Sequence, residues 1–198
     1  MLTVAGVGPG NPKYLTCDVK MRIENAKHIL AFGRVANSLK SIRDDIIEIN
    51  KVEEIMKYID VEKELLLLAS GDPNFFGIVD YLKRKGLRVK EVLPGLSSFQ
   101  YMMGKLQKSW QGANFLSLHG RNEDLDSIKS NKISILLVDK DNSPNKISKE
   151  LYKLNIKGKI YVGFNLSYDD EKIIIKNIGE EIENISFLGV VVVENEMG

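Results

Sequence analysis

The 198-residue sequence has a single cysteine, no long apolar run and almost no net charge. Its one cysteine, Cys17, excludes an internal disulfide and any metal site built from several cysteines. No apolar run has the length of a membrane span, and the first residues lack the basic region and apolar core of a signal peptide. We therefore expect a soluble protein of the cytoplasm.

Positive and negative side chains are nearly balanced. There are 28 Lys and Arg against 27 Asp and Glu, a formal net charge of +1. This balance argues against a surface for nucleic acid or a membrane patch. With 43% hydrophobic residues the chain can bury a sizeable core, in one large or two small domains.

The stretch LLLLASGDPNFFG, residues 65–77, changes abruptly from four leucines to a polar loop. A continuous apolar run that ends at a turn signal is typical of a strand covered on both faces in a parallel sheet. Residues 72–86 favour a helix capped by Asp72, with Pro73 in its first turn and Gly86 at its end.

The polar loop after this strand is a candidate binding segment. In open parallel sheets ligands bind outside the carboxyl ends of the strands, which are the positions of Ser70, Gly71 and Asp72. A plain strand-to-helix turn with a capping aspartate is the alternative interpretation.

A second loop rich in glycine follows the first expected strand, in AGVGPGNPKYLT at residues 5–16. Glycine lets a ligand approach the main chain closely. The spacing is GxGxG, however, whereas the dinucleotide motif is GxGxxG, and Pro9 removes a backbone donor. The next expected strand, residues 28–33, also ends without the acid that holds a ribose. A nicotinamide or flavin site is therefore disfavoured.

Strands and helices alternate through the first half of the chain, which predicts a mostly parallel α/β domain over residues 1–108. Besides the elements above, we expect a helix from a Thr16 cap to about residue 26, strands over 44–50 and 88–93, and helices over 34–42, 51–63 and 97–107.

The segment KSWQGA, residues 108–113, is interpreted as a linker into a second α/β domain over residues 109–198. We expect strands over 114–120, 132–140, 159–166, 172–178 and 187–195, and helices over 123–130 and 145–155. The short connection between the last two strands favours an antiparallel pair and hence a mixed sheet. We expect the two domains to face each other across a cleft.

Four segments in this order, AGVGPGNPKYLT, SGDPNFFG, PGLSS and SLHGR, resemble the tetrapyrrole (corrin/porphyrin) methylase superfamily. The resemblance continues in YVGFNLSYDDEKI and so covers nearly the whole chain. Within the superfamily the chain is most similar to the enzymes that methylate carbon 5 of cobalt-precorrin-7 or precorrin-6Y in cobalamin biosynthesis.

The resemblance implies a two-domain fold, usually dimeric, that binds S-adenosyl-L-methionine in the interdomain cleft and releases S-adenosyl-L-homocysteine. It implies no protein-bound metal. A second enzyme that methylates carbon 15 and decarboxylates a side chain is expected to be a separate protein, since this chain ends at Gly198. Methyl transfer to an electron-rich ring carbon needs alignment and exclusion of water, and no protein nucleophile.

Carried over residue by residue, the resemblance implies a set of cofactor-binding positions. They are Pro9, Ser70, Gly71, Asp72, Phe75, Ser97, Ser98, Val138 and Leu166. Ser70 departs from the Gly-Gly-Asp of many relatives. Asp72 is hypothesised to stabilise its loop and the cationic end of the cofactor, with a purely capping role as the alternative.

His119 and Arg121 are the candidate catalytic residues. They follow a strand of the second domain, so the rule applied to Ser70 directs them toward the cleft. His119 could orient substrate or assist proton loss after methylation, and Arg121 could pair with a substrate carboxylate. A loop histidine and a surface arginine are the alternative. Tyr168 and Glu171 match a family motif to which we assign no chemistry.

Two other kinds of function remain open on the sequence. Within the superfamily, the substrate could be another macrocycle position, a ribosomal RNA ribose or a translation-factor side chain. The balanced charge weighs against RNA. From another class, a noncatalytic nucleotide-binding α/β module would bind an adenosine compound without transferring a group.

Overall fold

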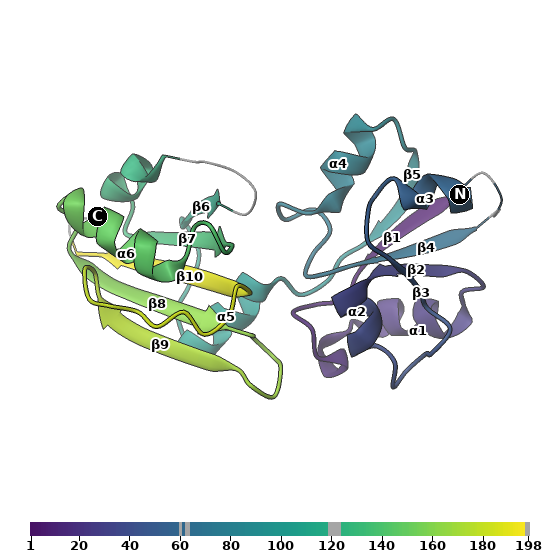
Figure 1. Ribbon diagram of the computed structural model, residues 1–198, viewed down its shortest axis with the longest axis horizontal. Coiled ribbons are helices and arrows are strands. Elements are labelled where there is room, and N and C mark those ends of the chain that lie inside the picture. The colour runs from purple at the N-terminus through teal and green to yellow at the C-terminus, as the bar shows by residue number, and fades with distance from the viewer. Residues whose placement is uncertain (60, 62–63, 119–123, 197–198) are drawn as a thin grey trace. The chain divides into compact units, whose positions relative to one another are not determined.

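The computed structural model describes residues 1–59, 61, 64–118 and 124–196. The chain forms two compact units, Met1–Ser98 (unit 1) and Phe99–Gly198 (unit 2). This division falls before the boundary expected after residue 108, because the helix that begins at Ser98 packs within unit 2. Each unit has its own five-stranded sheet, as Figure 1 shows.

Unit 1 contains a parallel sheet with the strand order β3-β2-β4-β1-β5. The strands are β1 (Leu2–Gly6), β2 (Ile29–Phe32), β3 (Ile47–Ile49), β4 (Leu65–Ala69) and β5 (Val89–Leu93). The central strand β4 is buried throughout, as its continuous apolar run predicts. The predicted parallel α/β character of this half is confirmed.

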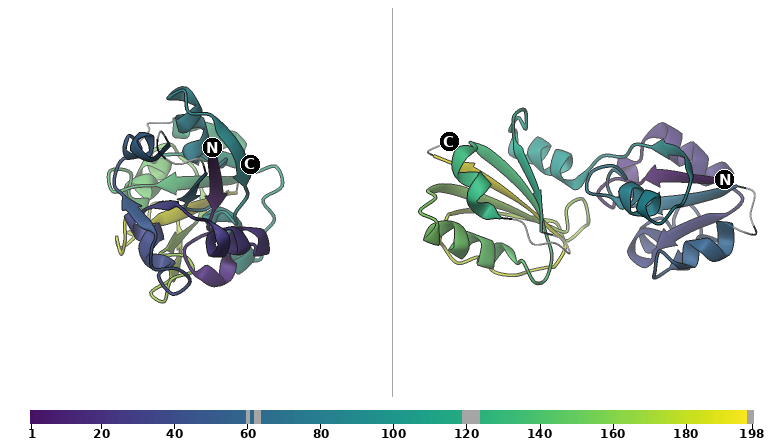
Figure 2. Two further views of the ribbon diagram at one scale, coloured as in Figure 1. Left: turned by 90° about the vertical axis from the view of Figure 1, so that its right-hand side faces the viewer. Right: turned by 90° about the horizontal axis from the view of Figure 1, so that it is seen from above.

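Helices cover both faces of the sheet of unit 1, called sheet 1 below (Figures 1 and 2). They are α1 (Cys17–Asn25), α2 (Gly33–Ser38), α3 (Glu54–Ile59) and α4 (Ile78–Arg84), with a 3₁₀ helix over Pro12–Tyr14. Leu66 and Leu68 pack with α1 and α2, whereas Leu65 and Leu67 pack with α3 and α4. Alternating residues of β4 thus enter two separate cores, which explains the four consecutive leucines.

The helix predicted over residues 72–86 is shorter than expected. It begins at Ile78, after a turn in which Phe76 has φ +47° and Gly77 lies against the carbonyl of Pro73. The prediction that Asp72 caps this helix is therefore wrong, whereas Gly86 follows it in the predicted left-handed conformation, with φ +77°. Thr16 caps α1 as predicted, because its hydroxyl accepts a hydrogen bond from the Val19 amide at 3.3 Å.

Unit 2 contains a mixed sheet with the strand order β6-β7-β10-β8-β9. The strands are β6 (Asn114–Ser117), β7 (Ile133–Val138), β8 (Gly158–Phe164), β9 (Lys172–Asn177) and β10 (Gly189–Asn195). Strands β6 and β7 are parallel and the other pairs are antiparallel. The mixed sheet is confirmed.

The predicted pairing of the last two strands is wrong. Among the described strands, β9 pairs with β8 alone, and β10 lies between β7 and β8. Residues 190–193 of β10 are four buried valines, which suit a central strand, whereas β9 exposes polar and apolar side chains at the sheet edge.

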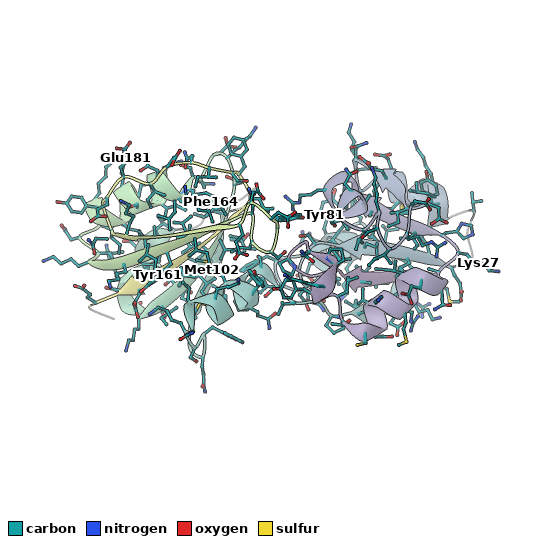
Figure 3. The ribbon with its side chains drawn as sticks, turned by 90° about the horizontal axis from the view of Figure 1, so that it is seen from below. Lys27, Tyr81, Met102, Tyr161, Phe164 and Glu181 are labelled. Atoms are coloured by element: carbon teal, nitrogen blue, oxygen red, sulfur yellow. The ribbon has the colours of Figure 1, made fainter. Side chains whose placement is uncertain are left out.

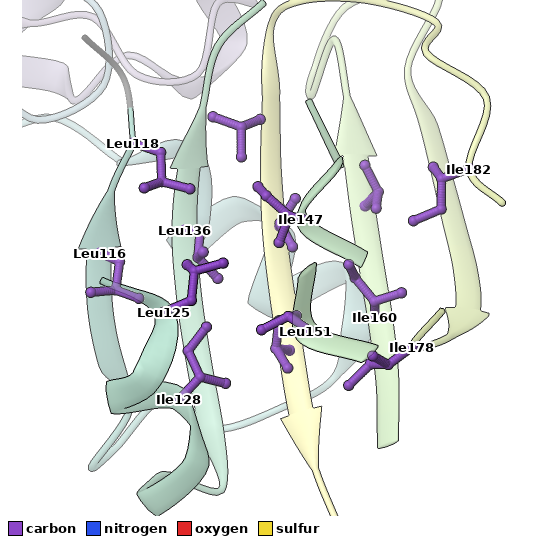
Figure 4. Close-up of a cluster of buried hydrophobic side chains, with 14 of the residues drawn as sticks. Leu116, Leu118, Leu125, Ile128, Leu136, Ile147, Leu151, Ile160, Ile178 and Ile182 are labelled. Carbon is purple, nitrogen blue, oxygen red and sulfur yellow. The ribbon is translucent and has the colours of Figure 1, made fainter. Parts of the chain in front are cut away.

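Helices also cover both faces of the sheet of unit 2, called sheet 2 below. They are α5 (Ser98–Leu106), α6 (Pro144–Lys153) and the 3₁₀ helix η2 (Leu125–Ser130), which takes the place of the helix predicted over 123–130. Figure 4 shows the core between the sheet and these last two helices, in which Leu125 and Ile128 of η2 and Ile147 and Leu151 of α6 pack against the strands. Met102 of α5 lies near Gly163 on the opposite face. Over the part of the chain that the structure describes, no helix is long and apolar enough to cross a membrane.

Candidate functional site

Three loops of unit 1 meet where neighbouring parallel strands end. Strands β4, β1 and β5 are adjacent, so the loops after Ala69, Gly6 and Leu93 leave the same edge of the sheet. This edge is where open parallel sheets bind ligands. The loops carry six of the predicted cofactor residues, Pro9, Ser70, Gly71, Asp72, Phe75 and Ser97, and a seventh, Ser98, begins α5 directly after the third loop.

Main-chain hydrogen bonds join the first two loops. The Val7 amide donates to the Ala69 carbonyl at 2.9 Å, continuing the strand pairing beyond β1. Gly8 and Gly71 then exchange two bonds: the Gly71 amide donates to the Gly8 carbonyl at 2.8 Å, and the reverse bond is 3.3 Å long. Main-chain hydrogen bonds therefore join the predicted binding segments around Pro9 and Ser70.

Glycine is required where the three loops pack. A Cβ atom on Gly6 would lie 2.5 Å from the Gly71 carbonyl oxygen, and one on Gly95 would lie 2.3 Å from the same atom. Gly71 differs: its φ is +66°, and the nearest atom to its Cβ position is the Ser97 Cα at 3.8 Å. Tight packing at Gly6 and Gly95 and the absence of crowding at Gly71 leave main chain that a ligand can approach closely.

Asp72 joins the second loop to the third. One carboxylate oxygen accepts a hydrogen bond from the Asn74 amide at 2.8 Å, and the other accepts one from the Gly95 amide at 3.3 Å. Its observed role is to hold the SGDP loop against the PGLSS loop. The residue stays partly exposed, so the carboxylate oxygens keep acceptor capacity at this surface.

The predicted residues of unit 1 differ in exposure. Pro9 and Ser97 are buried, Ser70 is exposed, and Ser98 is half-buried at the start of α5. Phe75 packs edge-to-face on Phe76, with ring centroids 4.9 Å apart. Ser70, where the sequence departs from the Gly-Gly-Asp pattern, is thus a residue that solvent can reach.

One edge of sheet 2 gathers the predicted residues of unit 2. Strand β7 ends at Val138, and Leu166 follows the end of β8. Gly189, the first residue of β10, is paired with Val138 on one side and with Phe164 on the other. Val138 and Leu166 are each 4% exposed, so each presents only a small apolar surface.

His119 and Arg121 lie outside the described residues. The residue that precedes them, Leu118, lies at the same edge of sheet 2: its amide donates to the Leu137 carbonyl at 2.9 Å. The carbonyl of Leu118 accepts a hydrogen bond from the Asn142 side chain at 3.0 Å.

A polar cluster in the loop after β8 was not predicted from the sequence. Glu171 accepts a hydrogen bond from the Ser167 amide at 2.6 Å and forms an ion pair with Lys105 at 3.3 Å. The Tyr101 hydroxyl is its third partner. Burial alone would raise the pKa of Glu171, but these three donors outweigh it and lower that pKa below its usual value. The match of Glu171 to a family motif was the only sequence signal for this cluster.

A pocket of about 230 Å³ lies at the opposite edge of sheet 1, where the strands begin. Met1, His28, Glu64, Arg22 and Lys90 are among its lining residues. Because ligands of parallel sheets bind at the carboxyl ends, this pocket is a poor match to the predicted site. No group of three or more His, Cys, Asp or Glu side chains among the described residues is placed to hold a metal ion.

The chain is similar in sequence to proteins of one family. The family model "Tetrapyrrole (Corrin/Porphyrin) Methylases" matches residues 1–181. A probable cobalt-precorrin-7 C(5)-methyltransferase of Methanocaldococcus jannaschii is 30% identical, over 99% of this chain and 99% of its own.

Solved structures share the fold. The precorrin-6Y methylase of Archaeoglobus fulgidus superposes with a TM-score of 0.77 at 21% identity, covering 99% of this chain and 98% of its own. The uroporphyrin-III C-methyltransferase of Thermus thermophilus, complexed with S-adenosylhomocysteine, superposes with a TM-score of 0.79 at 21% identity. The superposition covers 98% of this chain and 96% of that enzyme's chain. The resemblance and the α/β fold class predicted from the motifs are confirmed. The chain belongs to the tetrapyrrole (corrin/porphyrin) methylase family.

Proposed function

We propose that this methyltransferase uses S-adenosylmethionine to methylate carbon 5 of a cobalt-precorrin, or of the metal-free precorrin, in cobalamin biosynthesis. The observation that carries the proposal is the similarity, over both whole chains, to a relative named as a carbon 5 methyltransferase. A solved relative of the same fold was crystallised with S-adenosylhomocysteine, which supports the choice of cofactor.

The loops of unit 1 are suited to such a cofactor. Gly71 is not crowded and carries no side chain, so a ligand can contact its main-chain atoms, and the close packing at Gly6 and Gly95 leaves no room for side chains there. The bound cofactor supplies a methyl group on a positively charged sulfur. In our proposal Asp72 contributes a negative charge near that cation, in addition to its observed bonds within the loops.

The transfer breaks the sulfur–methyl bond and forms a bond from the methyl group to carbon 5, whose electrons attack in line. The protein must hold the two carbons close and aligned and keep water out. Val138 and Leu166 are proposed to contribute apolar contacts from unit 2. His119 and Arg121 keep their proposed roles in orienting substrate and assisting proton loss. Normal turnover by His119→Ala and Arg121→Ala variants would remove both roles.

The first test is calorimetric titration with S-adenosylhomocysteine, beside NAD and ATP. We expect selective binding of S-adenosylhomocysteine with micromolar affinity, which corresponds to about −8 kcal/mol. Incubation with S-adenosylmethionine and cobalt-precorrin-7 should then give a product methylated at carbon 5, located by NMR with a ¹³C-labelled methyl donor. A preference for NAD or ATP would contradict the proposal and favour a nucleotide-binding module.

The role of Asp72 is tested by comparing two ligands, because only S-adenosylmethionine carries the sulfonium charge. We expect Asp72→Ala to weaken the binding of S-adenosylmethionine more than the binding of S-adenosylhomocysteine. Asp80→Ala is the control, since Asp80 is an exposed acid of unit 1 whose side chain has no ion pair or hydrogen bond among the described residues. Equal losses for the two ligands, or none, would leave Asp72 with its loop-holding role alone.

The proposal extends to assembly and pathway. We propose a homodimer, which light scattering after gel filtration would test, and a separate enzyme for methylation at carbon 15. A cytoplasmic location stays a prediction from the sequence.

A further inference from the structure

The loop after β8 contains an unusual stretch of backbone. Asn165 and Ser167 have φ values of +47° and +74°, so two non-glycine residues in the left-handed region flank Leu166. Each such residue costs roughly 1 kcal/mol or more, because its Cβ crowds the main chain. Strain of this kind persists only where surrounding contacts enforce it, and it concentrates at functional sites.

Contacts around Asn165 enforce the first of these conformations. Its amide donates to the Leu188 carbonyl at 3.1 Å, and its side chain donates to the Asp170 carboxylate at 2.7 Å. The Tyr168 amide donates back to the Asn165 carbonyl at 3.0 Å. All these partners except Leu188 lie within the loop itself.

Glu171 enforces the second conformation. One of its carboxylate oxygens accepts the Ser167 amide at 2.6 Å, which holds the strained residue directly. The same carboxylate is bound by the Tyr101 hydroxyl and by the Lys105 ammonium group, both from α5. The Glu171 side chain is only 19% exposed, so these interactions are partly shielded from water.

Leu166 is positioned from below by packing. A Cβ on Gly163 would lie 2.7 Å from a Leu166 methyl group and 3.0 Å from the Met102 sulfur, so the leucine side chain folds over this glycine beside α5. Figure 3 marks Met102 in unit 2, together with Phe164 at the end of β8. Leu166 is thus fixed by Gly163 beneath it and by the strained backbone on either side.

Helix α5 connects this loop to another proposed cofactor residue. Ser98 is its first residue, and Tyr101 and Lys105 lie in the following turns of the same helix. Through these two residues, Glu171 ties the segment that carries Leu166 to the helix that begins at Ser98. One carboxylate therefore fixes the segment that carries Leu166 on α5.

We propose that Glu171 is a positioning residue for cofactor binding: it holds Leu166 in place by bonding the Ser167 amide and anchoring the loop to α5. The proposal rests on the proposed function, in which Leu166 contacts S-adenosylmethionine. Glu171 itself touches neither cofactor nor substrate in this scheme. Its loss would let Ser167 relax toward an ordinary backbone conformation and move Leu166 away from its place.

The experiment measures S-adenosylhomocysteine affinity by calorimetry for wild type, Glu171→Ala, Leu166→Ala and the double variant. We expect about tenfold weaker binding for Glu171→Ala, and for the double variant no more loss than for Leu166→Ala, because residues that act through one contact are not additive. Asp169→Ala is the matched control. It removes from the same loop an exposed acid whose side chain has no ion pair or hydrogen bond among the described residues, and should bind within twofold of wild type.

The outcomes separate the two proposals. If wild type does not bind S-adenosylhomocysteine, the proposed function fails. If wild type binds and Glu171→Ala binds equally well, only the positioning role is refuted. Losses that add fully in the double variant would also refute it, since a purely structural role of Glu171 is independent of Leu166.

A milder pair of variants covers the case in which Glu171→Ala does not fold. Tyr101→Phe removes one bond to the carboxylate and should weaken binding about threefold. Glu171→Gln keeps one acceptor oxygen for Ser167 and should retain more affinity than any variant lacking that oxygen. Wild-type affinity in Tyr101→Phe and Glu171→Gln together would overturn the proposal.

Discussion

Replacing Gly95 by alanine tests the packing of the three loops of unit 1. The new Cβ would lie 2.3 Å from the Gly71 carbonyl oxygen and 2.6 Å from the Gly6 carbonyl group. Since real Cβ atoms essentially never approach closer than 3.0 Å, the loops must separate by about 0.7 Å. The φ of Gly95 lies outside the left-handed region, so steric overlap is the dominant effect.

The expected cost follows from this displacement. Overpacking of a tight site costs about 1–3 kcal/mol. The hydrogen bond from the Gly95 amide to the Asp72 carboxylate is already 3.3 Å long and would be lost, which adds about 1 kcal/mol to the cost. We therefore expect Gly95→Ala to lower the free energy of unfolding by about 2–4 kcal/mol, measured by urea denaturation followed by far-UV circular dichroism.

The control for this substitution is Gly104→Ala, in the exposed interior of α5. No atom lies within 4 Å of a Cβ there, so alanine should stabilise the helix by about 0.5–1 kcal/mol. The two changes are chemically identical and are expected to have opposite signs. If Gly95→Ala proves as stable as wild type, the close approach of these loops is not as described. Its affinity for S-adenosylhomocysteine should also fall, because the loops form the proposed cofactor surface.

Three further predictions concern the core of unit 1 and the Glu194 carboxylate. Leu67→Ala should cost about 2–5 kcal/mol in urea denaturation because Leu67 is fully buried, whereas Met21→Ala, at 55% exposure, should change little. Glu194→Gln should lower the free energy of unfolding by about 1–3 kcal/mol, since Lys108 and Tyr161 both donate hydrogen bonds to this carboxylate, at 2.9 and 2.7 Å. An unchanged midpoint of urea denaturation, followed by tryptophan fluorescence, would contradict this expectation. Hydrogen bonds from Tyr161 and Lys108 lower the pKa of Glu194 in the folded protein. The contribution of Glu194 to the free energy of unfolding is therefore fully present above the unfolded pKa of about 4.3 and is lost as pH falls through the lower folded value. Wild type should lose more stability than Glu194→Gln across this acidic range.

Much of unit 1 could be predicted from local sequence patterns. The leucines of β4 alternate between two cores, and in a chain of alternating strands and helices a run that is apolar at every position favours a strand covered on both faces. The Thr16 cap and the left-handed Gly86 were also predictable, because each depends on neighbours within a few residues. The candidate loops followed from the rule that ligands bind at the carboxyl ends of strands.

Strand order in unit 2 was not predictable in the same way. A short connection favours pairing of successive strands, yet β10 lies between β7 and β8. Only in that position are both of its faces and both of its edges covered, and this depends on strands distant in the sequence. The hydrophobicity of the four valines indicated burial but not the neighbours that provide it.

By itself the sequence determined the α/β class, the family and the loops that carry the candidate site. Strand burial and turn chemistry depend on residues close together in the sequence, and the order of the motifs can be read directly from it. The tertiary structure decided what the charged residues do. Asp72 stands where the sequence predicts a helix cap. In the structure the sheet brings the Gly95 amide close to it, and this amide donates a hydrogen bond to its second carboxylate oxygen. Glu171 meets Tyr101 and Lys105 only because α5 packs on sheet 2. A carboxylate bonds the donors that folding places nearest to it, and residues far apart in sequence leave no local pattern by which to predict that choice.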